Sequence, residues 1–348
     1  MESVKLTVIG ILTFFLILIE LIIGFGTLTL INIPRIIIPF KFFKIFLAKV
    51  SNQIGDITVY GLKLIMLLMH GNTIQVINEQ KFDANTWYMA MSNHQSWADI
   101  FVLLVTANHR IPLLKFFMKK ELWWIPFVFL ANQTLNMPFV NRHSKEAIKK
   151  NPSLRHKDYK NTLKSCKRFL RTPSTIFSYA EGTRFTDEKH ALQGKKYKNL
   201  LSPKVGGMAT ALSAMPNIDT LIDFSLVYKS NKRGAWSFLT GEMKDVKVFI
   251  KSYAIPTHLK HRNYSEDEKY RDEFKTWIEE IWIEKDQKIS ELKVREKIKK
   301  AVELRITISS DKEAVRRGVV LFSLPTHAVE GGRLVWDTSD LILSLIHI

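Results

Sequence analysis

Cysteine is nearly absent from this 348-residue chain, in which Cys166 stands alone. One thiol excludes both an intrachain disulfide framework and a zinc ribbon, and it fits a reducing compartment. Cys166 lies in KNTLKSCKRFLR, a basic stretch with helical spacing. That context predicts a structural thiol, so the chemistry must come from other side chains.

Acidic residues are scarce: 33 Asp and Glu face 51 Lys and Arg, which gives a net charge of +18. Such an excess calls for a partner of opposite sign, which could be nucleic acid, an anionic membrane surface or a phosphorylated substrate. A nucleic-acid site would interleave aromatic residues with the basic run, but only Tyr159 and Phe169 stand between positions 142 and 171. We therefore expect lipids and not nucleic acid as partners.

Two kinds of catalytic motif are also missing. The chain contains no G-x-S-x-G nucleophile elbow and no Cys-His pair in a matching context. A metal site built from His94, Asp99 and His109 would lack further ligands at fixed spacing. The sequence thus predicts no resident metal and no covalent nucleophile.

What the chain does have is a long apolar N-terminus. From Leu6 to Leu30 it is interrupted by one charge, Glu20, and about 20 residues suffice to span a bilayer. A cleaved signal peptide is the alternative, but its apolar run would be only about 7 to 15 residues long. We therefore expect a retained anchor, with Glu20 protonated, near an interface or facing protein.

Basic residues predict the orientation of this anchor. Lys5 stands almost alone before the apolar run, whereas four cations follow it, which places the bulk of the chain on the cytoplasmic side. These four are Arg35, Lys41, Lys44 and Lys49. The segment PRIIIPFKFFKIFLAKV resembles a helix lying on an anionic surface, and LKLIMLLM (62–69) is short enough to be interfacial or core.

Beyond the anchor, predicted strands alternate with predicted helices. TIQVINEQ, TWYMAM, STIFSYA, DTLIDFSLVY and KVFIKSY are typical of strands, and WADIFVLLVTA and VGGMATALSA are typical of helices. A long charged helix follows, with Phe274, Trp277, Ile278 and Ile281 on one face. The fold class is therefore α/β, with a mixed, largely parallel sheet flanked by helices.

Three regions are expected from these patterns. Residues 1–70 form the membrane anchor and interfacial helices, and residues 71–300 form the α/β domain. Residues 301–348 form an atypical tail, whose last letters, LSLIHI, can be encoded by the end of a sequencing-library adaptor. We expect the tail to be an out-of-frame or adaptor-derived artefact and draw no function from it.

The stretch SNHQSWADI suggests acid–base chemistry. His94 and Asp99 are five positions apart, so on one helix they would not share a face. If His94 lies in a loop before a helix and Asp99 in its first turn, the carboxylate can fix the imidazole tautomer. The spacing by itself fits equally a helix-capping Asp99 and a loop histidine without catalytic function.

Two further stretches end at arginines. In AEGTRF, Gly182 allows a turn after a strand and Arg184 can bind phosphate, although a surface turn with an ion pair has the same composition. Glu181 cannot bind phosphate and would orient an arginine or bind a glycerol hydroxyl. In MPFVNR, Arg142 ends a short strand, which is where α/β proteins place ligands.

Together NHQSWAD, FVNR and EGTR, in this order, resemble the motif blocks of the PlsC-type glycerophospholipid acyltransferases. The resemblance runs from Thr58 to Leu292 and is greatest for the bacterial YihG-like branch and its lysocardiolipin-acyltransferase relatives. It implies an enzyme of the bacterial inner membrane that uses acyl-CoA or acyl carrier protein as co-substrate, without a cofactor. The acceptor would be a lysophospholipid such as 1-acylglycerol 3-phosphate.

The resemblance also implies roles for particular residues. His94 would be the general base, Asp99 its orienting partner and Asn93 a supporting residue. The acceptor and its phosphate would be bound by Arg142, Glu181, Gly182, Thr183 and Arg184. One block departs from the family pattern: Val227-Tyr228 stands where many members have Val-Pro, which puts acyl-chain preference in doubt.

Two other functions would use the same residues. A lipid hydrolase or thioesterase would activate water with the His94–Asp99 dyad and release fatty acid without an acceptor. A non-catalytic lipid-surface protein would bind lipid without acyl transfer.

Overall fold

The computed structural model describes residues 2–78, 80–119, 126–137, 139–140, 150–151, 153–166, 169–215, 217–243, 245–264 and 266–310. The chain divides into two compact units, Met1–Arg295 and Glu296–Ile348. The sheet and the candidate site lie in the first unit. Of the tail expected from the sequence, residues 311–348 lie outside the described residues.

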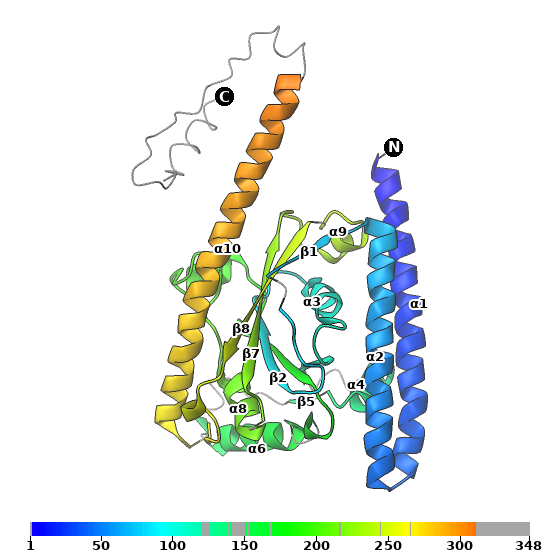
Figure 1. Ribbon diagram of the computed structural model, residues 1–348, viewed down its shortest axis with the longest axis vertical. Coiled ribbons are helices and arrows are strands. Elements are labelled where there is room, and N and C mark those ends of the chain that lie inside the picture. The colour runs from blue at the N-terminus through cyan, green and yellow to red at the C-terminus, as the bar shows by residue number, and fades with distance from the viewer. Residues whose placement is uncertain are drawn as a thin grey trace. The chain divides into compact units, whose positions relative to one another are not determined.

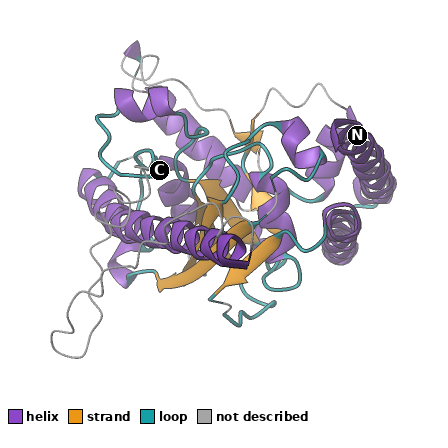
Figure 2. Cartoon of the chain, turned by 90° about the horizontal axis from the view of Figure 1, so that it is seen from above, coloured by secondary structure: helices purple, strands orange, loops and turns teal. Residues whose placement is uncertain are grey.

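The N-terminus forms a hairpin of two long helices, α1 (Glu2–Ile37) and α2 (Lys41–His70). Figures 1 and 2 show them side by side along one flank of the sheet domain. The helix boundaries differ from those expected: residues 34–37 belong to α1, and residues 41–50 and 62–69 are parts of α2. The chain turns at residues 38–40, because Pro39 lacks an N–H and disfavours helix at the residue before it. Everything from Lys41 to His70 is then one helix.

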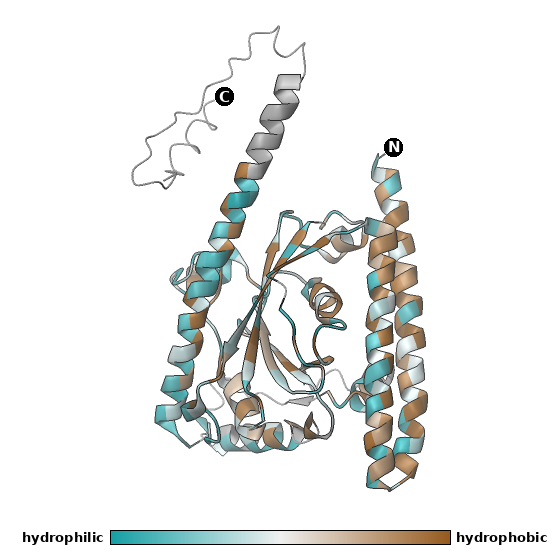
Figure 3. Cartoon of the chain, in the orientation of Figure 1, coloured by the Kyte–Doolittle hydropathy of each residue, from teal (hydrophilic) through white to brown (hydrophobic). Residues whose placement is uncertain are grey.

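The two helices pack through small residues. Glu20 of α1 lies against Gly61 of α2, where a Cβ would overlap its carboxylate. Glu20 therefore faces protein, one of the positions expected for it. Figure 3 shows α1 coloured largely as hydrophobic and α2 as a mixture, and both helices expose large apolar side chains. They include Ile11, Phe15, Ile19, Ile22, Phe42, Ile57, Leu64 and Leu68.

Both ends of α1 contact the sheet domain. Near its start, Gly10 lies against Trp236 and Thr240. Near its end, the Arg35 guanidinium donates hydrogen bonds to the Thr134 carbonyl at 2.5 Å and to Asn136 Oδ1 at 2.6 Å. The helix is long and apolar enough to cross a membrane, and the domain lies alongside it.

The domain is built on a six-stranded mixed sheet in the order β1-β8-β7-β2-β6-β3. Its strands are β1 (Ile74–Ile77), β2 (Tyr88–Ser92), β3 (Leu114–Phe116), β6 (Thr175–Tyr179), β7 (Thr220–Tyr228) and β8 (Val246–Ala254). β7, β2, β6 and β3 are parallel to one another, and β8 pairs antiparallel with β7. This confirms the predicted α/β fold with a mixed, largely parallel sheet.

Helices cover both faces of the sheet (Figure 2). On one face α3 (Asp99–Ala107) and the hairpin enclose a core that contains Leu103, Phe177 and Phe224. On the other, α8 (Gly206–Ala214) and α10 (Glu268–Ser310) enclose a second core around Met208, Phe274 and Trp282. Phe274, Ile278 and Ile281 are buried, as the spacing of the long helix predicts.

The other elements connect these layers. They are β4 (Met118–Lys119), α4 (Pro126–Thr134), β5 (Phe139–Val140), α6 (Ser153–Cys166), η2 (Phe169–Arg171), α7 (Asp187–Leu192), α9 (Ala235–Leu239) and η3 (Thr257–Leu259). α4 packs on α1, and α9 follows the loop after β7. Because β2, β6 and β7 run parallel, their carboxyl ends meet at one edge of the sheet, where α/β folds place ligands.

Candidate active site

His94 and Asp99 meet at that edge. β2 ends at Ser92, residues 93–98 form a loop, and Asp99 begins α3. His94 Nδ1 lies 2.8 Å from Asp99 Oδ2. This is the arrangement in which the sequence allowed the two side chains to meet, with the histidine in a loop and the aspartate in the first helical turn.

The Asp99 carboxylate is fully buried and surrounded by donors. Its Oδ2 accepts hydrogen bonds from the backbone N–H groups of Gln95, at 2.6 Å, and Ser96, at 3.0 Å, as well as from His94 Nδ1. Its Oδ1 accepts one from the Tyr228 hydroxyl at 2.5 Å. A buried ionised carboxylate is stable only with such partners, so the loop and β7 together hold the charge in place.

His94 is held on three sides. Its ring stacks on Tyr179 with centroids 3.9 Å apart. Its backbone N–H donates to Glu181 Oε1 at 3.0 Å, and its backbone carbonyl accepts from the Phe185 N–H at 2.7 Å. Since Nδ1 faces a carboxylate, Nδ1 carries the proton and Nε2 keeps its lone pair. The side chain is 19% exposed, so Nε2 can reach a substrate.

Asn93 joins the histidine loop to the neighbouring strand. Its side-chain amide donates to the Leu226 carbonyl at 3.0 Å, and its Oδ1 accepts from Leu226 N–H at 2.8 Å. Asn93 is fully buried. It therefore supports the site by fixing the loop to β7, and it makes no contact with the solvent-accessible side of His94.

Glu181 is a buried positioning residue. Besides the His94 N–H, its carboxylate accepts the Leu201 N–H at 3.3 Å. Burial raises the pKa of Glu181 to about 7, although both backbone donors and the nearby Lys285 lower it. With 0% exposure, Glu181 is enclosed by protein, away from the surface where the resemblance would have it bind the acceptor.

The remaining residues of the EGTR motif form an exposed cationic turn. Gly182 has φ +65°, a left-handed conformation that favours glycine, and a Cβ there would meet Lys204 Cδ at 2.9 Å. Lys189 Nζ donates to Thr183 Oγ1 at 2.8 Å and to the Arg184 carbonyl at 3.1 Å. Arg184 is exposed and forms no ion pair within the described residues. Three cations thus surround the turn.

The structure does not test one predicted residue, because Arg142 lies outside the described residues. Conversely, the sequence reasoning missed four side chains at this edge: Tyr179, Tyr228, Lys189 and Lys204. The signal for the tyrosines was available, since each ends a strand next to the motif loops. Lys189 lies only five positions after Arg184, so its closeness was also available, whereas the loop that carries Lys204 reaches the turn only through the fold.

The arrangement suits proton transfer. Nε2 can take a proton from a hydroxyl while Asp99 stabilises the resulting imidazolium, and the cationic turn can bind an anionic group of the same substrate. Among the residues that the structure describes, no group of three or more His, Cys, Asp or Glu side chains could hold a metal ion.

Comparison with known proteins identifies the segment that carries this site. Residues 73–229, from the residue before β1 to the residue after β7, match the family model described as acyltransferase. This segment includes His94, Asp99, Glu181 and Arg184.

Two individual proteins are similar over longer stretches. The 2-acyl-1-lysophosphatidylinositol acyltransferase of Saccharomyces cerevisiae is 24% identical over 251 residues, which cover 64% of this chain and 62% of that protein's length. The crystal structure of the 1-acyl-sn-glycerophosphate (LPA) acyltransferase PlsC from Thermotoga maritima has a TM-score of 0.48 and 16% identity. That match covers 84% of this chain and 98% of the other.

The buried Glu181 carboxyl generates a pH-dependent prediction. Its pKa rises from 4.5 to about 7 on folding, so the native state binds more protons than the unfolded state in this window. The free energy of unfolding therefore falls by on the order of 3 kcal/mol as the pH rises from 4.5 to 7, and it changes little above pH 7. Glu181→Gln should reduce this slope in the unfolding temperature of the purified protein between pH 5 and 8.

The exposed Glu188 provides the matched control. Glu188→Gln removes a carboxylate from the first turn of α7 and should leave the slope as in the wild type. Identical slopes for the wild type and Glu181→Gln would contradict the raised pKa.

Proposed function

We propose that the chain is a membrane-bound acyltransferase that moves a fatty acyl group from acyl-CoA or acyl carrier protein to the free hydroxyl of a lysophospholipid. The observation that carries this is the buried Asp99 carboxylate bonded to His94, in a segment of the acyltransferase family. An acceptor such as 1-acylglycerol 3-phosphate would fit the adjacent cationic turn. On its motif blocks, we also place the chain in the YihG-like branch.

The proposed reaction is a direct transfer. The acceptor hydroxyl loses its proton to His94 Nε2 as its oxygen forms a bond to the thioester carbonyl carbon. Asp99 stabilises the imidazolium through Nδ1–H. The tetrahedral intermediate then breaks its carbon–sulfur bond, and the leaving sulfur takes the proton from Nε2. Ester and free thiol are released, His94 returns to its starting state, and no resident cofactor is needed.

The acceptor's phosphate would be bound at the cationic turn. Arg184 can make a bidentate contact with phosphate oxygens, and Lys189 and Lys204 flank it. The hydrogen bond from Phe185 N–H to the His94 carbonyl ties this turn to the general base. Binding the phosphate there would bring the neighbouring hydroxyl of the same molecule toward Nε2. Arg142 stays a further candidate for this contact.

We propose that the hairpin lies on the membrane. A crossing helix would need about 30 Å of hydrocarbon free of polar protein, but α1 contacts the domain at both ends, through Gly10 and Arg35. The outward apolar face can instead bury its side chains in one leaflet, while basic residues contact anionic headgroups. The bacterial inner membrane, with the domain on the cytoplasmic side, is the proposed location.

Replacing the general base should abolish transfer. In membranes or detergent with labelled acyl-CoA and a panel of lysophospholipids, His94→Ala should lower turnover by about 10² to 10⁴, because proton removal is lost. The exposed His258 supplies a control, since His258→Ala should retain full activity. Unchanged turnover in His94→Ala would reject the dyad, and fatty acid release that ignores the acceptor would indicate a hydrolase.

Removing the exposed arginine should weaken acceptor use selectively. Arg184→Ala should raise the acceptor KM by about 10- to 100-fold, the cost of lost charge-assisted hydrogen bonds, and leave the donor KM unchanged. Lys198→Ala removes another exposed positive charge and serves as the control. A normal acceptor KM in Arg184→Ala, or an equal rise in both variants, would count against a phosphate site at the turn.

A further inference from the structure

The second oxygen of the dyad's carboxylate has its own dedicated donor. Three donors from residues 94–96 converge on Asp99 Oδ2, whereas Oδ1 accepts from the Tyr228 hydroxyl alone at 2.5 Å. Tyr228 is the last residue of β7 and is 6% exposed. Burial and the neighbouring Asp99 charge raise the pKa of the Tyr228 phenol, so it keeps its proton and acts as the donor.

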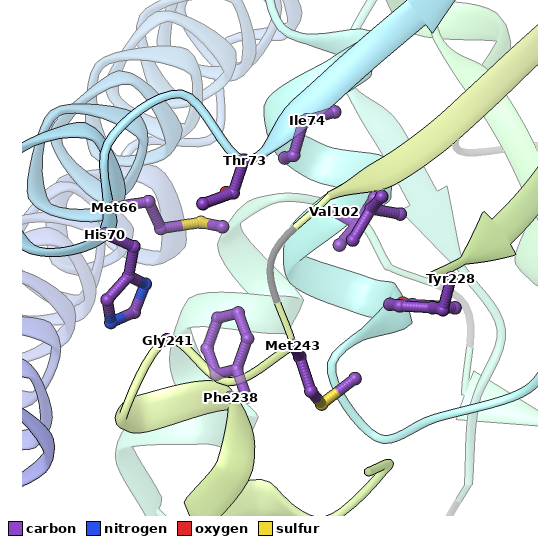
Figure 4. Close-up of a pocket in the computed structure, with 10 residues that line it drawn as sticks. Met66, His70, Thr73, Ile74, Val102, Tyr228, Phe238, Gly241 and Met243 are labelled. Carbon is purple, nitrogen blue, oxygen red and sulfur yellow. The ribbon is translucent and has the colours of Figure 1, made fainter. Parts of the chain in front are cut away.

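An apolar cavity lies beside Tyr228. Its ring borders an apolar cavity between α2, α3 and α9, whose wall includes Met66, Val102 and Phe238 (Figure 4). His70 also borders this cavity, but its Nε2 lies 2.9 Å from the Leu239 carbonyl. The phenol thus has an apolar cavity on one side and hydrogen-bonds Asp99 on the other.

The loop after β7 fixes the tyrosine from the other side. The Arg233 guanidinium lies over the Tyr228 ring at 4.5 Å, and the Arg233 carbonyl accepts from Ser96 Oγ at 2.9 Å. Ser96 belongs to the histidine loop, whose N–H groups bond Asp99. Arg233 thus contacts both the Tyr228 ring and the histidine loop, and both of these supply hydrogen bonds to the Asp99 carboxylate.

Other ionisable groups face this carboxylate from neighbouring elements. They are Tyr179 of β6, Glu181 after β6, Arg233 after β7 and, beyond Glu181, Lys285 of α10. Lys285 Nζ forms an ion pair with Asp223 Oδ1 at 2.7 Å. The Tyr179 hydroxyl is buried and has no hydrogen-bond partner in the described part of the chain. In the described part of the chain, the side chains that hydrogen-bond the Asp99 carboxylate are those of His94 and Tyr228.

We propose that Tyr228 is a positioning residue of the acyl-transfer reaction, which holds Asp99 in the orientation that engages His94 and disperses the negative charge of the carboxylate. This inference rests on the proposed function of the same site. It assigns a role to the block in which the chain has Val227-Tyr228 in place of Val-Pro, since a proline at position 228 would have no hydroxyl to donate.

Charge dispersal has a measurable consequence. A donor on Oδ1 stabilises the dyad in its proton-accepting form, in which imidazole is neutral and Asp99 ionised. Removing that donor favours proton uptake by the dyad as a whole. In Tyr228→Phe the acid limb of the kcat/KM pH profile should therefore move to higher pH, by about one unit for one hydrogen bond to a charged group. If Tyr228 had only a structural role, the acid limb of the pH profile would stay at its wild-type position.

The matched control is Tyr88→Phe. Tyr88 is also a buried tyrosine on a central strand, and its hydroxyl bonds the backbone of Asp83 instead of the dyad. Tyr228→Phe loses one phenol hydrogen bond and Tyr88→Phe loses two, and both variants keep the ring. Only Tyr228→Phe should shift the acid limb, and the acceptor KM should stay within a few-fold of wild type in both.

A second readout does not depend on turnover. Carbethoxylation of His94 by diethyl pyrocarbonate, followed by peptide mass spectrometry on the folded full-length protein, gives the pH midpoint of imidazole reactivity. This midpoint should rise by about one unit in Tyr228→Phe and not in Tyr88→Phe. Equal midpoints in all three proteins, or equal shifts in both variants, would overturn the role of Tyr228. If the wild type transfers no acyl group, the proposed function fails, but the midpoints still decide whether Tyr228 acts on the dyad.

Discussion

Asp99 carries a negative charge with no exposed surface, and burying such a charge costs several kcal/mol unless donors surround it. The chain supplies those donors from two separate places, the loop after β2 and the end of β7. Both must be aligned for the carboxylate to be stable. The geometry of the dyad is therefore set by the sheet register that brings Tyr228 beside the loop of residues 93–98.

The same edge of the sheet joins His94 to the charges around it. Asn93 fixes the histidine loop to β7, and Glu181 bonds it from the opposite side, after β6. The turn that follows Glu181 exposes Arg184 to solvent and returns a hydrogen bond to His94. One continuous set of contacts thus links His94 to the turn that carries Arg184, while the hairpin offers an apolar face outside the sheet.

The sequence predicted the local features of this site, because they depend on neighbouring residues. The five-residue spacing of His94 and Asp99, the glycine turn at Gly182 and the strands β2, β6 and β7 all follow from short-range patterns. Contacts between distant segments could not be predicted from such patterns. The Tyr228–Asp99 bond joins residues 129 positions apart, and Glu181 accepts a hydrogen bond from the backbone of Leu201. The hairpin was missed because the proline break at residues 38–40 was read as part of a surface helix.

The central claim is that an ionised Asp99 enables His94 to accept a proton. The most direct test is the turnover of Asp99→Asn, whose side chain has the same shape and can still accept the Gln95 and Ser96 N–H groups through its carbonyl oxygen. Without the charge opposite Nδ1, kcat should fall by about 10³ to 10⁴, with the protein folded and the acceptor KM little changed. Turnover within a few-fold of wild type would contradict the account.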